Sequence, residues 1–324
     1  EREEDRLPPV QLREGMLFQL LGAVRSPIGR GASGALHSGR FACSLGSGRR
    51  LPRWRCCNEG SASSPGNESG TVPAREVRAW VQTTVIGLGL CPWAVRAARS
   101  NAIKYITCSA EHTSGVAQEL RMEAAKLCRQ GAAPWTTSMV VCPRVAHWST
   151  DFAAFDAWVS GSRELDDLEG AVSLVTFHPN FERWRELAPG VGPGSTVLSH
   201  YEEPDGRRSQ RTLPAVIVTT DPQVVGARRV GVRFLDDNVE QWVPLDWLGF
   251  RSLSCKPLPD NWMHRAPHPT VHLIRRRDLW RVREADGGYE TVAEVQVRNS
   301  RRIQELGCPR LEEMARSSSQ PLDH

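Results

Sequence analysis

Ala171 to Phe177 reads Ala-Val-Ser-Leu-Val-Thr-Phe, a short and mostly apolar run that predicts a buried strand. A second such run, Thr-Ser-Met-Val-Val-Cys, lies at Thr137 to Cys142, and a third predicted strand covers Ile103 to Cys108. Helical spacing of apolar residues separates these runs at Thr113 to Cys128, and a further helix is expected at Asp151 to Val159. Strands that alternate with helices predict an α/β fold with a mostly parallel sheet and flanking helices.

The α/β pattern extends on both sides of these strands. A helical pattern begins at Ala74 and is broken at Gly87, a short helix is expected to begin at Pro92, and a last helix covers Thr291 to Leu306. In open sheets of this kind, ligands bind at the carboxyl ends of the strands. A functional site is therefore expected at that edge.

Residues 196–254 have a different pattern. Leu213 to Thr219 is one mostly apolar run, Arg229 to Phe234 alternates strictly, and Asp236 to Asn238 supplies a turn. Short strands and tight turns without a helix predict a small, all-β antiparallel barrel inserted into the α/β domain. The expected organisation is a leader at 1–72, an α/β domain at 73–195 and 255–310, the barrel at 196–254 and a disordered tail at 311–324.

The formal net charge of +4, from 41 Lys and Arg against 37 Asp and Glu, is unevenly distributed. Residues 16–58 contain seven Arg and no acidic residue, and they are rich in Ser, Gly and Ala. This composition is typical of an organelle transit peptide, with a basic arm that is never cleaved as the alternative. The leader predicts a mitochondrial or plastid location, or otherwise the cytoplasm. Because the rest of the chain is close to neutral, net charge gives no support for nucleic-acid binding.

The nine cysteines are scattered and include no C-x-x-C pair. Neither a zinc module nor a disulfide framework is expected from this spacing, which favours reduced thiols in an intracellular compartment. No cofactor is implied. The longest apolar candidate for a membrane span, Val85 to Val95, is shorter than the roughly 20 residues required and is interrupted by Gly87, Gly89 and Pro92.

Two resemblances follow from particular strings. Val230 to Asp237 and Glu240 to Leu245 resemble the second and third strands of Tudor and Agenet-type SH3-like barrels. The remaining core resembles the family called domain of unknown function 1415 over about residues 75–307, minus the inserted barrel. The ordered motifs that carry this second resemblance are Val85 to Ala94, Phe177 to Phe181, Arg265 to Arg275, Arg298-Asn299 and Glu305 to Gly307.

The chain departs from the motifs of this family at several positions. The family pattern has Asn at Gly89 and His264, Ser at Ala266, Tyr at His268 and Glu at Arg276. If these polar groups bind substrate in relatives, the activity here is changed or lost. The family itself implies no established reaction.

One candidate site combines a cysteine with two histidines and an arginine. Cys91 precedes Pro92, which is favoured at the first position of a helix, and a helix N-terminus is expected to lower the pKa of a thiol. His178 follows the strand that ends at Phe177, and Arg265 and His272 come from a third segment. A nucleophile, a base and an anion-binding residue would form a site for acyl or phosphoryl transfer or for hydrolysis. The alternative is that these residues have only structural roles.

The predicted barrel suggests a second function. Its aromatic residues are candidates for a cage around methylated Arg or Lys, where cation–π attraction contributes about 0.5–2 kcal/mol per ring, although aromatic residues of such small barrels also fill the core. The cage candidates are Tyr201, Phe234, Trp242, Trp247 and Phe250, with Asp236 adding charge. The sequence thus leaves two functions open: an enzyme acting on an unknown small molecule, or an adaptor whose barrel binds a protein or RNA.

Overall fold

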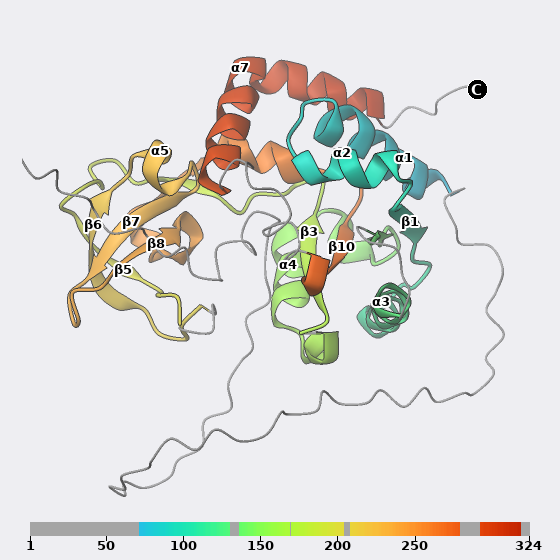
Figure 1. Cartoon of the computed structure of the whole chain (residues 1–324), viewed down its shortest axis with the longest axis horizontal. Helices are drawn as coiled ribbons and strands as arrows, with labels where there is room; N and C mark the ends of the chain where they lie inside the picture. Colours follow the sequence, from blue (N-terminus) through green and yellow to red (C-terminus); the bar gives the residue numbers. More distant parts are fainter. Residues whose placement is uncertain (1–70, 130–135, 169, 204–207, 279–291, 319–324) are drawn as a thin grey trace, which may run out of the picture. The chain divides into compact units, whose positions relative to one another are not determined.

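A computed structural model of the chain describes residues 71–129, 136–168, 170–203, 208–278 and 292–318. Its main sheet has four strands in the order β1 (Ile103–Thr107), β2 (Thr137–Val141), β10 (Thr270–Arg275) and β3 (Val172–Phe177). The first three predicted strands are therefore confirmed as β1, β2 and β3, with ends that differ by a residue. Figure 1 shows these strands in the part of the chain that also contains helices α1 to α4.

The sheet is mixed, whereas the sequence predicts a mostly parallel one. β1 and β2 pair in parallel, but β10 pairs antiparallel with both β2 and β3. The three predicted strands do run in one direction. The difference arises from β10, whose sequence TVHLIR the sequence analysis does not predict as a strand. β10 follows the β-rich segment and lies between β2 and β3, antiparallel to both.

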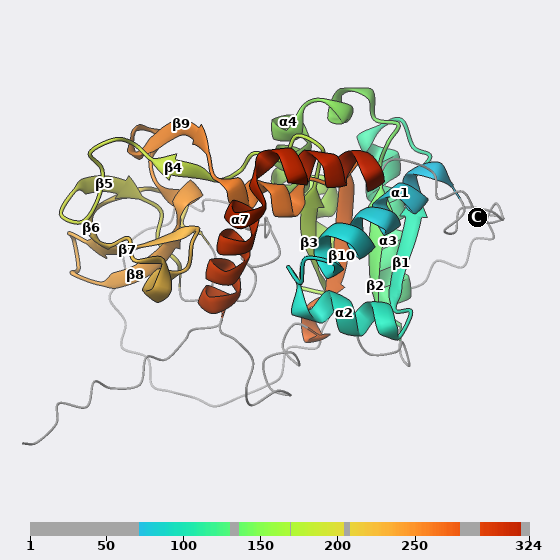
Figure 2. The same ribbon diagram turned by 90° about the horizontal axis from the view of Figure 1, so that it is seen from above.

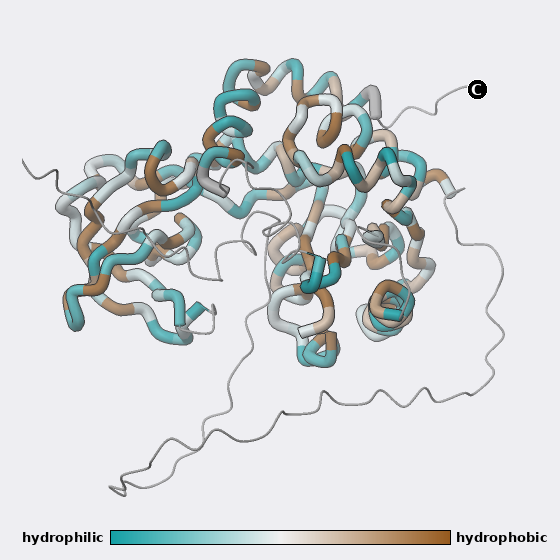
Figure 3. Tube along the Cα trace, in the orientation of Figure 1, coloured by the Kyte–Doolittle hydropathy of each residue, from teal (hydrophilic) through white to brown (hydrophobic). Residues whose placement is uncertain are grey.

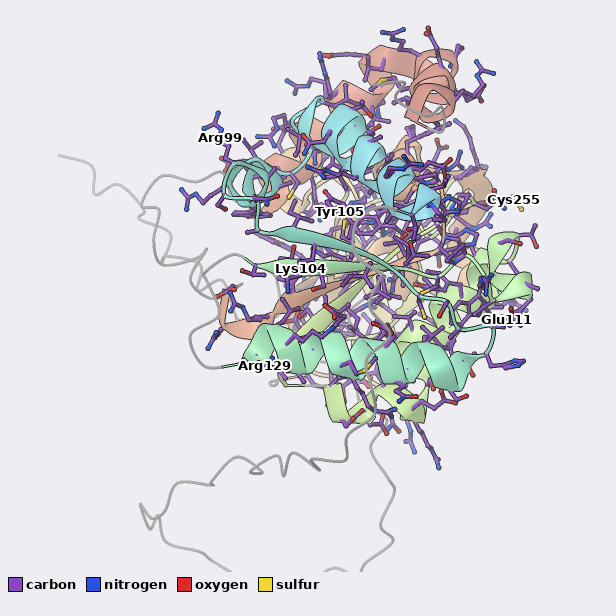
Figure 4. The ribbon with its side chains drawn as sticks, turned by 90° about the vertical axis from the view of Figure 1, so that its right-hand side faces the viewer. Arg99, Lys104, Tyr105, Glu111, Arg129 and Cys255 are labelled. Atoms are coloured by element: carbon purple, nitrogen blue, oxygen red, sulfur yellow. The ribbon has the colours of Figure 1, made fainter. Side chains whose placement is uncertain are left out.

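Helices cover both faces of this sheet. α1 (Val72–Trp80) packs on one face through Ala74, Val77 and Trp80, and α2 (Pro92–Arg99) lies on the same side (Figure 2). α3 (Thr113–Cys128) and α4 (Phe152–Gly161) cover the other face. In Figure 4, β1 with Lys104 and Tyr105 runs between α2, which ends at Arg99, and α3, which ends before Arg129.

Local chemistry sets the ends of these helices. The Asp151 carboxylate caps α4 by accepting a 2.8 Å hydrogen bond from the Ala154 N–H. Pro92 begins α2, and Cys91 before it has extended backbone. The π-helix η2 (Val81–Ile86) is joined to α2 by a turn in which Gly89 has a φ of +65°, a conformation that favours glycine. This turn brings Cys91 back toward the sheet.

Residues 185–257 form two further sheets. The larger of them, which we call the second sheet, is antiparallel and has four strands: β5 (Thr196–Ser199), β6 (Leu213–Thr219), β7 (Arg229–Phe234) and β8 (Glu240–Pro244). β4 (Arg185–Leu187) pairs with β9 (Leu253–Pro257). Within the described residues no ladder between β5 and β8 closes a barrel. This segment also contains the short helix α5 (Pro222–Val225) and the 3-10 helices η5 (Leu245–Trp247) and η6 (Phe250–Ser252), whereas no helix was expected.

The last helix is longer than predicted. α7 runs from Val292 to Ser318 and is kinked at Gly307, where φ is +70°. Figure 3 shows that its sequence is largely hydrophilic, but Ile303 and Leu311 are buried at 1% and 3% exposure. Pro309 is tolerated because it lies in the first turn after the kink. The disordered tail predicted from residue 311 is therefore wrong for 311–318, since burial of Leu311 holds this part on the domain.

The predicted transit peptide at residues 16–58 lies outside the described residues. Among the helices that the structure describes, none combines the length and the apolar sequence needed to cross a membrane.

Candidate functional site

A cavity of about 150 Å³ lies on the α1 and α2 side of the main sheet. Apolar side chains make up most of its wall, including Trp80, Trp93, Met139 and Phe177. Five residues with titratable side chains and one amide also reach the wall. These are Cys91, Arg228, His264, His272, Asp278 and Asn299. A largely apolar concavity with a few converging polar groups is the usual form of a small-molecule site.

Cys91 precedes the first turn of α2 and is partly exposed as a residue. Burial of the thiol raises its pKa, and hydrogen bonds from the backbone of Ala94 and Trp93, together with the charge of Arg298, act in the opposite direction. The lowered pKa expected from the helix N-terminus is therefore wrong. Desolvation of the thiolate in an apolar wall outweighs the effect of the helix end.

His272 projects from β10 into the same wall. Its Nε2 is buried and has no hydrogen-bond partner among the described residues. Burial alone lowers the pKa of His272 to about 4. At neutral pH the His272 ring is thus uncharged, and its Nε2 has no hydrogen-bond partner among the described residues. A general base requires an unprotonated nitrogen of this kind.

His264, at the end of η7 (Pro259–His264), was not predicted as a site residue. Its ring stacks between Phe177 and Phe181, at centroid distances of 5.1 and 4.7 Å. Burial lowers its pKa well below the ordinary value, and the charge of Arg228 adds to this effect. His264 therefore contributes a second neutral imidazole. In the sequence this residue stands out only as a departure from the family pattern.

Arg228 and Asp278 bring charge to the wall. Asp278 is neutralised by Arg275, whose Nε donates to its Oδ2 at 2.6 Å. Arg228 is only 3% exposed and its guanidinium carbon lies 4.0 Å from the Trp184 ring centroid. No sequence signal marked Arg228, because a pair of arginines before a strand ordinarily faces solvent.

Two of the four predicted catalytic residues are not in the cavity wall. His178 is fully buried, where its Nε2 contacts the Trp148 carbonyl oxygen and its Nδ1 accepts a 2.9 Å hydrogen bond from the Asn180 N–H. Side chains alternate along a strand, so Phe177 faces the cavity and His178, the next residue, turns to the opposite side. Arg265 donates from Nε to the Phe181 carbonyl oxygen at 3.3 Å and covers the Trp262 ring.

The five aromatic cage candidates differ in how far they are exposed. Phe234 and Trp247 are 3% and 7% exposed and belong to the core of that sheet. Tyr201 packs partly buried against the same core, in an edge contact with Phe234. Trp242 is half-buried, and Phe250 is 81% exposed beside Arg251. Asp236 is exposed in the turn after β7. Because Phe234 and Trp247 are buried, neither ring exposes a face to which a methylated cation could bind.

The described residues contain no group of three or more His, Cys, Asp or Glu side chains placed to hold a metal ion.

Residues 73–186 match the family model described as "Protein of unknown function (DUF1415)". No curated protein and no solved structure matches the chain.

The DUF1415 match runs from the first turn of α1 into β4. It includes Cys91 and the apolar wall residues on α1, η2, α2, β1 and β2. Arg228, His264 and His272 come from outside the matched residues. The cavity is thus built jointly by the DUF1415 segment and by the chain that follows it.

Proposed function

We propose that the protein is an enzyme that hydrolyses or transfers a small acyl group in this cavity, with Cys91 as the nucleophile and His272 as the general base. The observation that carries the proposal is that Cys91 and His272 line one apolar cavity, although 181 positions separate them in the chain, and that the buried Nε2 of His272 has no partner among the described residues. Among the predicted catalytic residues these are the two that share a wall.

The state of the two groups defines the first step. Both are neutral at pH 7, because burial raises the pKa of Cys91 and lowers that of His272. His272 accepts the thiol proton as Sγ bonds to the carbonyl carbon of the substrate and the negative charge moves to the carbonyl oxygen, while the backbone N–H groups at the start of α2 hydrogen-bond to Sγ as its proton leaves. The carbonyl then re-forms, the bond to the leaving group breaks, and the leaving group takes the proton from His272. Water next attacks the thioester, the C–Sγ bond breaks, and Cys91 regains a proton from that water as the carboxylic acid is released.

The composition of the wall favours an acyl group over a phosphoryl group. Phosphoryl transfer develops charge on several oxygens and is stabilised by clusters of cations. Among the described wall residues, Arg228 is the one arginine or lysine, and both histidines are held neutral. An apolar wall of this kind instead accommodates the hydrocarbon part of an ester or thioester.

The direct test is acylation of the full chain by p-nitrophenyl butyrate. We expect a burst of p-nitrophenol and one butyryl group on Cys91, located by peptide mass spectrometry. Cys91→Ser should lose both the burst and the thioester adduct. Cys255→Ser is the matched control, because Cys255 is an exposed thiol on β9. Butyrylation confined to the exposed cysteines would overturn the proposal.

The pH dependence provides a second prediction. An ordinary histidine base would give an acid limb near pH 6.5. The pKa of His272 is lowered to about 4, so the ring remains unprotonated, and able to accept a proton, until the pH falls to that value. The acylation rate constant, measured by stopped-flow absorbance, should be level above about pH 5 and fall roughly tenfold per unit below about pH 4. A half-maximal rate at pH 6–7 would show that His272 is not the base.

A further inference from the structure

Arg228 is a buried arginine, and two of its three guanidinium nitrogens have no hydrogen-bond partner among the described residues. It is 3% exposed, and its Nε and Nη1 atoms are buried without a hydrogen-bond acceptor among the described residues. The side chain lines the cavity. A buried guanidinium with unpaired N–H groups is costly in an apolar surrounding, and it strongly favours an anion that brings acceptor oxygens.

The neighbouring charges do not satisfy these donors. The nearest carboxylate is Asp260, whose Oδ1 lies 3.9 Å from Nε, too far for a hydrogen bond, and Asp260 is also hydrogen-bonded to Ser300. Asp246 is engaged by Arg183 at 2.7 Å.

Arg229, the next residue, donates to the Trp242 carbonyl oxygen and interacts with Glu202, and Asp278 at the wall is paired with Arg275. The acidic side chains near the cavity are thus engaged elsewhere or lie beyond hydrogen-bonding distance. The Nε and Nη1 N–H groups of Arg228 therefore have no acceptor among the described residues.

The cavity limits the size and character of that ligand. Apolar cavities of about 150 Å³ accommodate one molecule the size of benzene. Arg228 is the one arginine or lysine among the described wall residues and the neighbouring His264 is neutral, so the wall itself supplies no second cation for a doubly charged group. A single guanidinium matches the geometry of one carboxylate.

We infer that Arg228 binds the carboxylate of a small organic acid whose apolar body is about the size of one aromatic ring. The inference rests on the proposed function in taking this cavity as the active site, and it names the acid that hydrolysis there would release. Arg228 directly precedes β7, so the chain that follows the DUF1415 match completes a site that the matched residues begin.

Calorimetric titration of the unaltered full chain tests this inference without any substitution. Benzoate and benzamide have nearly the same shape, but benzamide carries no charge. We expect benzoate to bind at least about tenfold more tightly, the effect of a charge-assisted hydrogen bond. Inorganic phosphate should not displace it. Equal affinity for benzoate and benzamide, or competition by phosphate at similar concentrations, would contradict the assignment.

Substitutions then locate the binding group. Arg228→Gln and the apolar Arg228→Met should each remove the preference for benzoate. Benzamide should still bind to both variants, which would show that the cavity remains folded. Arg251→Gln removes an exposed arginine beside Phe250 and should keep the preference. A preference for benzoate that survives both substitutions of Arg228 would place the anion elsewhere.

Failure of this inference is distinguishable from failure of the proposed chemistry. Cys91→Ser should bind benzoate normally, because the thiol is not the anion-binding group. Benzoate binding without acylation of Cys91 would retain the role of Arg228 and reject the nucleophile. Acylation of Cys91 without any preference for benzoate would do the reverse.

Discussion

His272→Gln is expected to lower kcat/KM for p-nitrophenyl butyrate by about 10²- to 10⁴-fold, the usual contribution of a positioned general base. Glutamine has a similar size but cannot accept and return a proton. Because both the Cys91 thiol and the His272 ring are neutral in the resting protein, nucleophilic attack requires proton removal during the step itself. A preformed thiolate would not need this base.

His112→Gln is the matched control for this substitution. His112 is exposed before α3, and its side chain makes no capping hydrogen bond. It should keep the unaltered rate. The substitution of His272 should also leave the melting temperature nearly unchanged, since the Nε2 atom that it removes has no partner among the described residues. A loss of rate below about fivefold would reject His272 as the base.

Trp148→Ala is expected to lower the free energy of unfolding by about 3–5 kcal/mol, the range for removal of a large buried aromatic side chain. Trp148 is 0% exposed, and its ring contacts Phe155 and Trp158 at centroid distances of 5.1 and 4.8 Å. Its carbonyl oxygen also contacts Nε2 of His178. The substitution leaves a large void in the core on the α3 and α4 face, which urea unfolding would report as a lower midpoint.

Phe250→Ala is the matched control for aromatic truncation. Phe250 is 81% exposed, so its removal should change stability by no more than about 0.5 kcal/mol. A loss comparable to that of Trp148→Ala would mean that the second sheet buries Phe250 in solution. A small loss for Trp148→Ala would contradict the packing described for this core.

Local patterns in the sequence predicted most elements of the main domain. The apolar runs at Thr137 to Cys142 and Ala171 to Phe177 are strands, and Thr113 to Cys128 is a helix, because their periodicity determines which side chains are buried. The segment after residue 196 has the predicted antiparallel pairing of β6, β7 and β8. Closure into a barrel depends on contacts between distant strands, which no local pattern specifies.

The candidate site was only partly predictable. Cys91 was identified from the proline that follows it, and His272 from the resemblance to a family. His178 was chosen because it follows a strand, but alternation of side chains turns it away from the cavity. The predicted direction of the pKa shift of Cys91 was wrong, because burial of the thiol outweighs the local effect of the helix end. That burial depends on packing by other elements.

The sequence by itself determined β1, β2 and β3 and the flanking helices of the main domain, the antiparallel hairpins after residue 196 and the position of Cys91 at the start of a helix. These follow from side-chain periodicity and from the restricted backbone of proline and glycine, which act over a few residues. Only the tertiary structure decided that β10 enters the sheet antiparallel and that Cys91, Arg228, His264 and His272 share one wall. Their burial, and hence their charge and reactivity, depends on segments far apart in the chain that exclude water together.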